Sequence, residues 1–192
     1  MLRRLYDWTL SLAAGPRAPA ALGTVSFVES SVFPIPPDIL LIPMVIARRE
    51  KAWWYALLCT LTSVAGGIAG YLIGMFLFEQ IAVPVLTFYG KMAFVDEFKV
   101  IFHEWGWWFV FIAGLTPFPY KVITIASGAL GLSLPVFIMA SIVSRGIRFC
   151  VVAGLLYFFG PPIRDFIEKR LGLMFTLFVV LLVGGFVALK YI

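Results

Sequence analysis

The stretch Pro34-Ile35-Pro36-Pro37-Asp38 decides the fold of this chain, because it places three prolines and a carboxylate inside an apolar run. A second stretch, Thr116-Pro117-Phe118-Pro119-Tyr120-Lys121, has the same Pro-x-Pro spacing, and aligning the two places Asp38 opposite Lys121. Proline interrupts a helix, and a bare charge in hydrocarbon is costly. Two such interruptions predict a membrane protein built from two broken-helix repeats around a buried polar site.

The composition supports an integral membrane protein. Hydrophobic residues make up 62% of the 192 residues and charged residues only 13%, whereas a soluble domain carries about 25% charge. The net charge of +5 does not indicate nucleic-acid binding, because the basic residues form short clusters between apolar runs. Such clusters are typical of the loops between membrane spans, and we expect no nucleic-acid partner.

The first half of the chain predicts an interfacial helix followed by a hairpin. Residues 1–19 have the spacing of an amphipathic helix that lies in the membrane interface. Residues 20–46 are apolar, but they contain Glu29 and the first proline stretch, which a plain spanning helix does not tolerate. A re-entrant hairpin does, because non-helical backbone at membrane depth is allowed where protein or water covers it.

Residues 52–78 are long enough to span the bilayer. Within them Gly66, Gly70 and Gly74 recur every four residues. Small residues at this spacing let another helix approach closely, so we interpret the stripe as a packing surface rather than a binding site.

The second half of the chain repeats this order. Residues 79–105 have the pattern of an amphipathic linker, residues 106–131 of a second hairpin, and residues 133–160 of a second span. Residues 161–192 predict a polar loop and a C-terminal transmembrane helix. The expected fold is therefore all-α: two inverted repeats, each a re-entrant helical hairpin plus a transmembrane helix, with interfacial helices and a final span.

The distribution of basic residues favours re-entrant hairpins. If both hairpins return to the side on which they start, nine basic residues share one side of the membrane: Arg3, Arg4, Arg17, Arg48, Arg49, Lys51, Arg164, Lys169 and Arg170. The other side then holds only Lys91, Lys99 and Lys190. The positive-inside rule makes the nine-residue side cytoplasmic.

Five ionisable residues lie inside apolar segments, and such residues usually mark a transport path. They are Glu29, Asp38, Lys121, Arg145 and Arg148. Guanidinium groups match the geometry of phosphate, so we expect Arg145 and Arg148 to bind an anionic headgroup, with Lys121 as a third basic contact. Glu29 and Asp38 are the candidates for proton coupling.

Inverted repeats bring the hairpin tips together at mid-membrane. We therefore expect Asp38 and Lys121 to meet as an ion pair, and Glu29 to lie within reach of Arg145 or Arg148. An alternative is that these charges only hold the hairpins in place. The prolines expected to break the hairpin helices are Pro34, Pro36, Pro37, Pro117 and Pro119. We expect neither a metal nor a cofactor, and no enzymatic activity, because the sequence shows no metal-ligand spacing and no nucleophile–base pair.

These residues resemble the DedA family of bacterial inner-membrane proteins, whose shared core is the VTT domain (SNARE-associated Golgi protein family). The resemblance covers residues 20–160 and is strongest to the short YqaA-like branch. The matching segments are Phe27-Val28-Glu29-Ser30-Ser31, the first proline stretch, Pro119-Tyr120-Lys121 and Ser127-Gly128. In this comparison Glu29 and Asp38 occupy the places of the family's acidic pair, and Lys121 stands where many members have arginine. The family often has another arginine ahead of that proline, where this chain has Leu115 or Thr116.

The resemblance implies two re-entrant hairpins in inverted repeat in a multi-pass protein of the bacterial inner membrane. It also implies a flippase or scramblase for an anionic or zwitterionic phospholipid or for undecaprenyl phosphate, with membrane lipids and protons as partners. Two alternatives stay open, a proton-driven transporter of small solutes or ions and a non-transporting membrane scaffold. Homo-oligomerisation also stays open.

Overall fold

The computed structural model describes residues 15, 17–32, 36–78, 80, 83–88, 92–116 and 119–160. The helices, in chain order, are α2 (Ala18–Ser31), α3 (Asp38–Ala47), η1 (Arg49–Lys51), α4 (Ala52–Leu77), α5 (Val83–Phe88), α6 (Met92–Leu115), α7 (Tyr120–Ala129) and a last helix, Leu134–Gly160. No strand occurs in these ranges. Most of the predicted interfacial helix, and the loop and span predicted over residues 161–192, lie outside the described residues.

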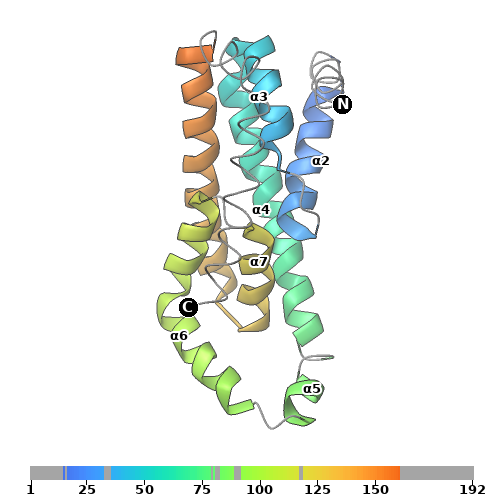
Figure 1. The fold of residues 1–192 in the computed structure, drawn as a ribbon, viewed down its shortest axis with the longest axis vertical. Helices are drawn as coiled ribbons and strands as arrows, with labels where there is room; N and C mark the ends of the chain where they lie inside the picture. The colour runs from blue at the N-terminus through green and yellow to red at the C-terminus, as the bar shows by residue number, and fades with distance from the viewer. Residues whose placement is uncertain are drawn as a thin grey trace, which may run out of the picture.

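Two long helices, α4 and Leu134–Gly160, form the spine of the molecule (Figure 1). Both are long and apolar enough to cross a membrane, and they lie within the ranges 52–78 and 133–160 in which spans were predicted. They run antiparallel, because Ala52 at the start of α4 and Leu156 near the end of the last helix share one buried cluster.

Two pairs of shorter helices pack against this spine, α2 with α3 in one half of the molecule and α6 with α7 in the other (Figure 1). The chain breaks between the members of each pair at the proline stretches. Pro37 immediately precedes α3 and Pro119 immediately precedes α7. With 14 and 10 residues, neither α2 nor α3 reaches the length of about 20 residues that a spanning helix needs.

The order short helix, short helix, long helix occurs twice, at nearly the same offset. Pro34 and Pro117 are 83 residues apart. Shifted by about that distance, α3 falls on α7 and α4 falls on Leu134–Gly160. Each short pair also has its own apolar core, one around Leu41 and Met44 and the other around Tyr120 and Phe137.

The boundary predicted between an amphipathic linker (79–105) and a hairpin (106–131) differs from the structure. α6 continues unbroken from Met92 to Leu115, so the end of the linker and the first arm of the hairpin form one helix. Gly106 lies inside it against Leu132. A single helical glycine costs only about 1 kcal/mol, so the helix persists until Pro117 removes a backbone donor.

The glycines of α4 allow both short pairs to approach its backbone. A Cβ on Gly66 would overlap the carbonyl oxygen of Phe27 in α2, and one on Gly74 would overlap that of Ile125 in α7. Between them, Gly70 lies beside the point where α2 and α7 meet. There the Thr124 hydroxyl of α7 donates to the carbonyl oxygen of Ser30 in α2 at 3.2 Å. The glycine stripe is thus a shared packing surface for the two halves.

Candidate functional site

Arg145, in the middle of the Leu134–Gly160 helix, is fully buried and joins three helices. Its Nη2 donates to Oε2 of Glu29 in α2 at 2.8 Å, and its Nε donates to the hydroxyl of Ser63 in α4 at 2.7 Å. The side chains of Arg145 and Glu29 are 0% and 15% exposed. A buried charge is tolerated only when a partner and hydrogen bonds compensate its desolvation, and this arrangement supplies both.

Serine hydroxyls close the first ion pair into a ring. The hydroxyls of Ser63 and Ser30 lie 2.7 Å apart, and Ser30 also contacts Oε2 of Glu29 at 3.2 Å. The ring therefore runs from Arg145 through Ser63 and Ser30 to Glu29 and back to Arg145. Buried polar groups are expected to be satisfied in this way, and the ring fixes the position of the Glu29 carboxylate.

Aromatic rings cover the Arg145 guanidinium. Its central carbon lies 4.7 Å from the ring centroid of Tyr120 and 4.8 Å from that of Phe149. The Tyr120 hydroxyl in turn donates to Ser141 at 2.5 Å. A desolvated cation over an aromatic face gains about 2 kcal/mol. Tyr120 begins α7, so the second proline stretch contributes an aromatic ring to this site.

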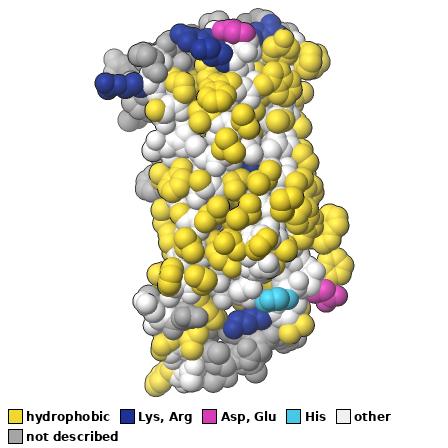
Figure 2. Space-filling model, turned by 180° about the vertical axis from the view of Figure 1, so that it is seen from behind, with side chains coloured by type: hydrophobic (Ala, Val, Ile, Leu, Met, Phe, Trp, Pro, Cys, Tyr) yellow, Lys and Arg dark blue, Asp and Glu magenta, His cyan; other side chains and the backbone are white. Residues whose placement is uncertain are grey.

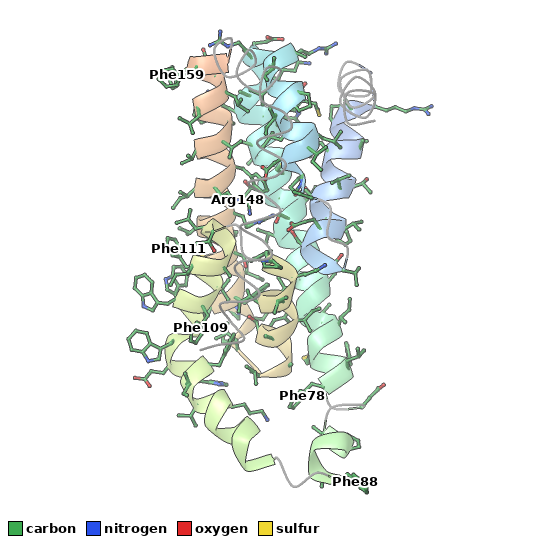
Figure 3. The ribbon with its side chains drawn as sticks, in the orientation of Figure 1. Phe78, Phe88, Phe109, Phe111, Arg148 and Phe159 are labelled. Atoms are coloured by element: carbon green, nitrogen blue, oxygen red, sulfur yellow. The ribbon has the colours of Figure 1, made fainter. Side chains whose placement is uncertain are left out.

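Arg148 links the two helix breaks. Its Nη2 donates to Oδ2 of Asp38 at 2.8 Å, and its Nη1 donates to the carbonyl oxygen of Thr116 at 3.5 Å. Asp38 begins α3, and Thr116 directly follows α6. The Asp38 carboxylate also lies at a helix N-terminus, where the helix dipole favours negative charge. In Figure 3 Arg148 lies near mid-height, where the two short pairs meet.

The two ion pairs leave one donor and one acceptor free. Nη1 of Arg145 and Oδ1 of Asp38 are buried and have no hydrogen-bond partner within the described part of the chain. Buried polar atoms without partners are rare in native structures. These two atoms, one on a cationic and one on an anionic group, are the unsatisfied polar atoms of the two ion pairs.

The predicted ion pair between Asp38 and Lys121 is wrong, because Asp38 pairs with Arg148. Lys121 follows Tyr120, and neighbouring residues of a helix point about 100° apart. Since Tyr120 is fully buried, Lys121 does not share its inward direction. It is partly exposed and makes no ion pair with any residue that the structure describes. Of the two partners predicted for Glu29, the structure selects Arg145.

Four residues of the site had no role in the sequence-based prediction: Ser30, Ser63, Tyr120 and Phe149. For two of them the sequence contained a signal that could have indicated a role in the site. Ser30 directly follows Glu29, and Ser63 extends the small-residue stripe of α4 by one turn beyond Gly66. The predicted helix breakers Pro36, Pro37 and Pro119 lie at the two breaks, while Pro34 and Pro117 lie outside the described residues.

Comparison with known proteins places this site within a family. Residues 35–158 match the VTT domain. A protein of Haemophilus influenzae is 34% identical over 186 residues, which cover 97% of this chain and 96% of that protein. A protein of Histophilus somni is 34% identical over 151 residues, or 79% and 78% of the two chains. Neither relative's name states an activity, and no solved structure matches. The chain therefore belongs to the VTT-domain family, which includes the DedA proteins that its sequence resembles.

Proposed function

We propose that this protein is a membrane lipid transporter, a flippase or scramblase that moves a phospholipid or undecaprenyl phosphate across the bacterial inner membrane. Membership of a family associated with membrane transport supports the proposal, as do two helices of spanning length. The observation that carries it is a pair of arginines in one such helix, each bonded to a carboxylate beside a helix break. Ionisable groups at this depth usually serve transport.

The free atoms of the site suit a phospholipid headgroup. Nη1 of Arg145 is a charged donor that fits a phosphate oxygen. Oδ1 of Asp38 is a charged acceptor that fits an ammonium group. A zwitterionic headgroup offers both, and a purely anionic one uses the arginine alone. Lys121, which is partly exposed and follows the buried Tyr120, is in this proposal an additional contact for the phosphate as it enters.

Proton coupling through the same ion pairs is part of this proposal. A protonated Glu29 or Asp38 no longer balances its arginine, and an unbalanced buried guanidinium favours an anion in its place. A proton on the carboxyl and a phosphate on the arginine would therefore enter the site together. In this proposal Glu29 and Asp38 take up protons, and Arg145 and Arg148 bind the headgroup.

Re-entrant hairpins in inverted repeat supply the conformational change in this proposal. α2–α3 and α6–α7 occupy opposite halves of the molecule (Figure 1), and Arg148 contacts both breaks. In transporters of this kind one repeat moves against the other around a fixed central site. The Thr124–Ser30 hydrogen bond between the halves would break during such a movement.

Reconstitution into liposomes tests the function. Fluorescent phosphatidylethanolamine, phosphatidylglycerol and undecaprenyl phosphate are each measured for transbilayer movement with and without a pH gradient. We expect movement above that of empty liposomes, and a loss of about tenfold or more in Arg145→Ala/Arg148→Ala, because a hydrogen bond to a charged group contributes about 1.5–3 kcal/mol. Arg49→Ala, outside the site, is the control variant.

The outcomes separate the alternatives. Movement no faster than in empty liposomes would refute the lipid transporter, and proton-driven uptake of a solute by the same liposomes would then support the small-solute transporter. Absence of both activities would leave the membrane scaffold. Unchanged lipid movement in the folded double variant would remove the arginines from the mechanism.

A further inference from the structure

A groove of about 370 Å³ lies between α2 and α4 and belongs to none of the contacts described so far. Its lining residues are Pro19, Ala20, Gly23, Thr24, Phe27, Leu58 and Thr62. The two threonine hydroxyls are already satisfied, because Thr24 donates to the carbonyl oxygen of Ala20 at 2.9 Å and Thr62 to that of Leu58 at 2.8 Å. The hydroxyl hydrogens are thus occupied within each helix, and the groove presents a mainly apolar surface.

The inner end of the groove lies beside the polar site. Phe27 of the lining belongs to the point at which the backbones of α2 and α4 approach each other closely, at Phe27 and Gly66. Thr62 of the lining directly precedes Ser63, which binds Arg145. A molecule in the groove would therefore contact the residue of α4 that directly precedes Ser63.

The outer end of the groove lies at a basic end of the molecule. Arg17 caps the start of α2, two residues before Pro19, and is exposed. α2 and α4 begin at the same end of the bundle (Figure 1), where Arg48, Lys51 and the carboxylate of Glu50 are also exposed. Figure 2 shows basic side chains gathered at this end and apolar side chains across the middle of the surface.

We propose that the groove binds one acyl chain of a phospholipid whose phosphate lies against the basic end at Arg17. An apolar channel with cationic groups at one end complements an amphipathic anion, with the phosphate at the membrane surface and the chain along α2 and α4. The inference rests on the proposed function and adds to it a loading position, in which the lipid waits beside the polar site. Gly23 lets α2 pack closely against α4 within the groove lining, because Thr62 Cγ2 lies only 3.2 Å from the Cβ position of Gly23.

Photolabelling of the unaltered protein tests this directly. The full chain is placed in liposomes of phosphatidylethanolamine and phosphatidylglycerol with a trace of phosphatidylglycerol that has a diazirine at the middle of one acyl chain. After irradiation, mass spectrometry locates the adducts. We expect them on Phe27, Leu58 and Thr62, and adducts confined to other faces of the molecule would overturn the proposal.

Two matched variants sharpen the test. Thr24→Trp fills the groove from an exposed position, and it should lower labelling of Leu58 and Thr62 about tenfold, because it excludes at least about two methylenes from the groove. Leu61→Trp adds the same ring at an exposed position of α4 outside the groove, and it should leave labelling unchanged. Equal labelling in the two folded variants would overturn the proposal.

Charge and alternative occupants are tested with the same assay. Arg17→Gln should reduce labelling by phosphatidylglycerol several-fold, and an unchanged yield would refute the phosphate contact. If a second copy of the chain fills the groove instead, Thr24→Cys, at an exposed position of the lining, in a Cys150→Ala background would form a disulfide between copies when copper phenanthroline is added as the oxidant, and this would overturn the proposal.

The failure of this inference differs from a failure of the proposed function. Groove labelling without any lipid movement would refute the transporter and leave the acyl-chain site in place. Lipid movement without groove labelling would refute the site and leave the transporter in place. Movement at the unaltered rate in Thr24→Trp, with labelling lost, would show that the groove is not a loading position.

Discussion

At the residue scale, the pairing of Arg145 with Glu29 is the contact on which the centre of the molecule depends. The guanidinium has no exposure and satisfies the Glu29 carboxylate together with Ser30. Loss of one partner of a buried pair costs about 3–5 kcal/mol, since the other charge stays buried without compensation. Removing one partner would therefore destabilise the protein by more than the formation of the pair stabilises it.

A double-mutant cycle tests this dependence. We expect Arg145→Gln and Glu29→Gln each to lower the stability by about 3–5 kcal/mol, and the combined variant to lose clearly less than the sum. Thermal unfolding in detergent measures all three. Arg148→Gln is the comparison, and because its side chain is 19% exposed it should lose less than Arg145→Gln. Additive losses in the cycle would show that the two side chains do not stabilise each other.

The sequence predicted which residues form the site better than it predicted their partners. Four of the five expected ionisable residues form the two ion pairs of the structure. A charged side chain in an apolar segment usually faces the interior of the protein and pairs with an opposite charge. The partner predicted for Asp38, Lys121, was wrong, because the direction of Lys121 depends on how α7 is rotated about its axis. Tyr120 is the residue that faces inward, and the spacing of the sequence does not show which of two adjacent residues in a short helix does so.

At the element scale, the helices could be predicted wherever proline or a polar loop ends an apolar run. α3 and α7 follow directly after the two proline stretches. The start of α6 could not be predicted, because residues 92–115 contain no proline and their change from amphipathic to apolar composition does not interrupt the hydrogen bonds of a helix. Composition shifts mark a change of surroundings, whereas proline marks the end of an element.

The glycines of α4 provide a prediction about helix packing. A methyl group on Gly74 would overlap the carbonyl oxygen of Ile125, so Gly74→Ala should push α7 away and lower the stability by about 1–3 kcal/mol. Gly154→Ala is the control, because its Cβ would meet Trp53 at an ordinary 3.5 Å. The control should be neutral or gain up to about 1 kcal/mol from helix propensity. Unfolding in detergent measures both variants, and equal effects would contradict the role of Gly74 in packing.

At the scale of the whole molecule, the two halves are joined by few but specific contacts. Thr124 bonds to Ser30, and Arg148 contacts both Asp38 and Thr116. These contacts lie between two separate apolar cores. The sequence predicted two related halves and placed both arginines on one span, but it could not show that Arg148 contacts both helix breaks. That result depends on the position of Leu134–Gly160 along the spine, which no local pattern specifies.

The arrangement of the halves predicts the membrane topology. Arg17 precedes α2 and Arg48 follows α3, so a pair that re-enters the bilayer places both on one side. Ser133 is exposed and precedes the last helix, at the end of the bundle where α7 ends.

In a background with Cys59→Ala and Cys150→Ala, we expect Arg17→Cys and Arg48→Cys to react with an impermeant maleimide from the cytoplasmic side. Ser133→Cys should react only from the opposite side. Labelling of Arg17→Cys and Arg48→Cys from opposite sides would mean that α2 and α3 together cross the membrane, and the re-entrant arrangement would then be untenable.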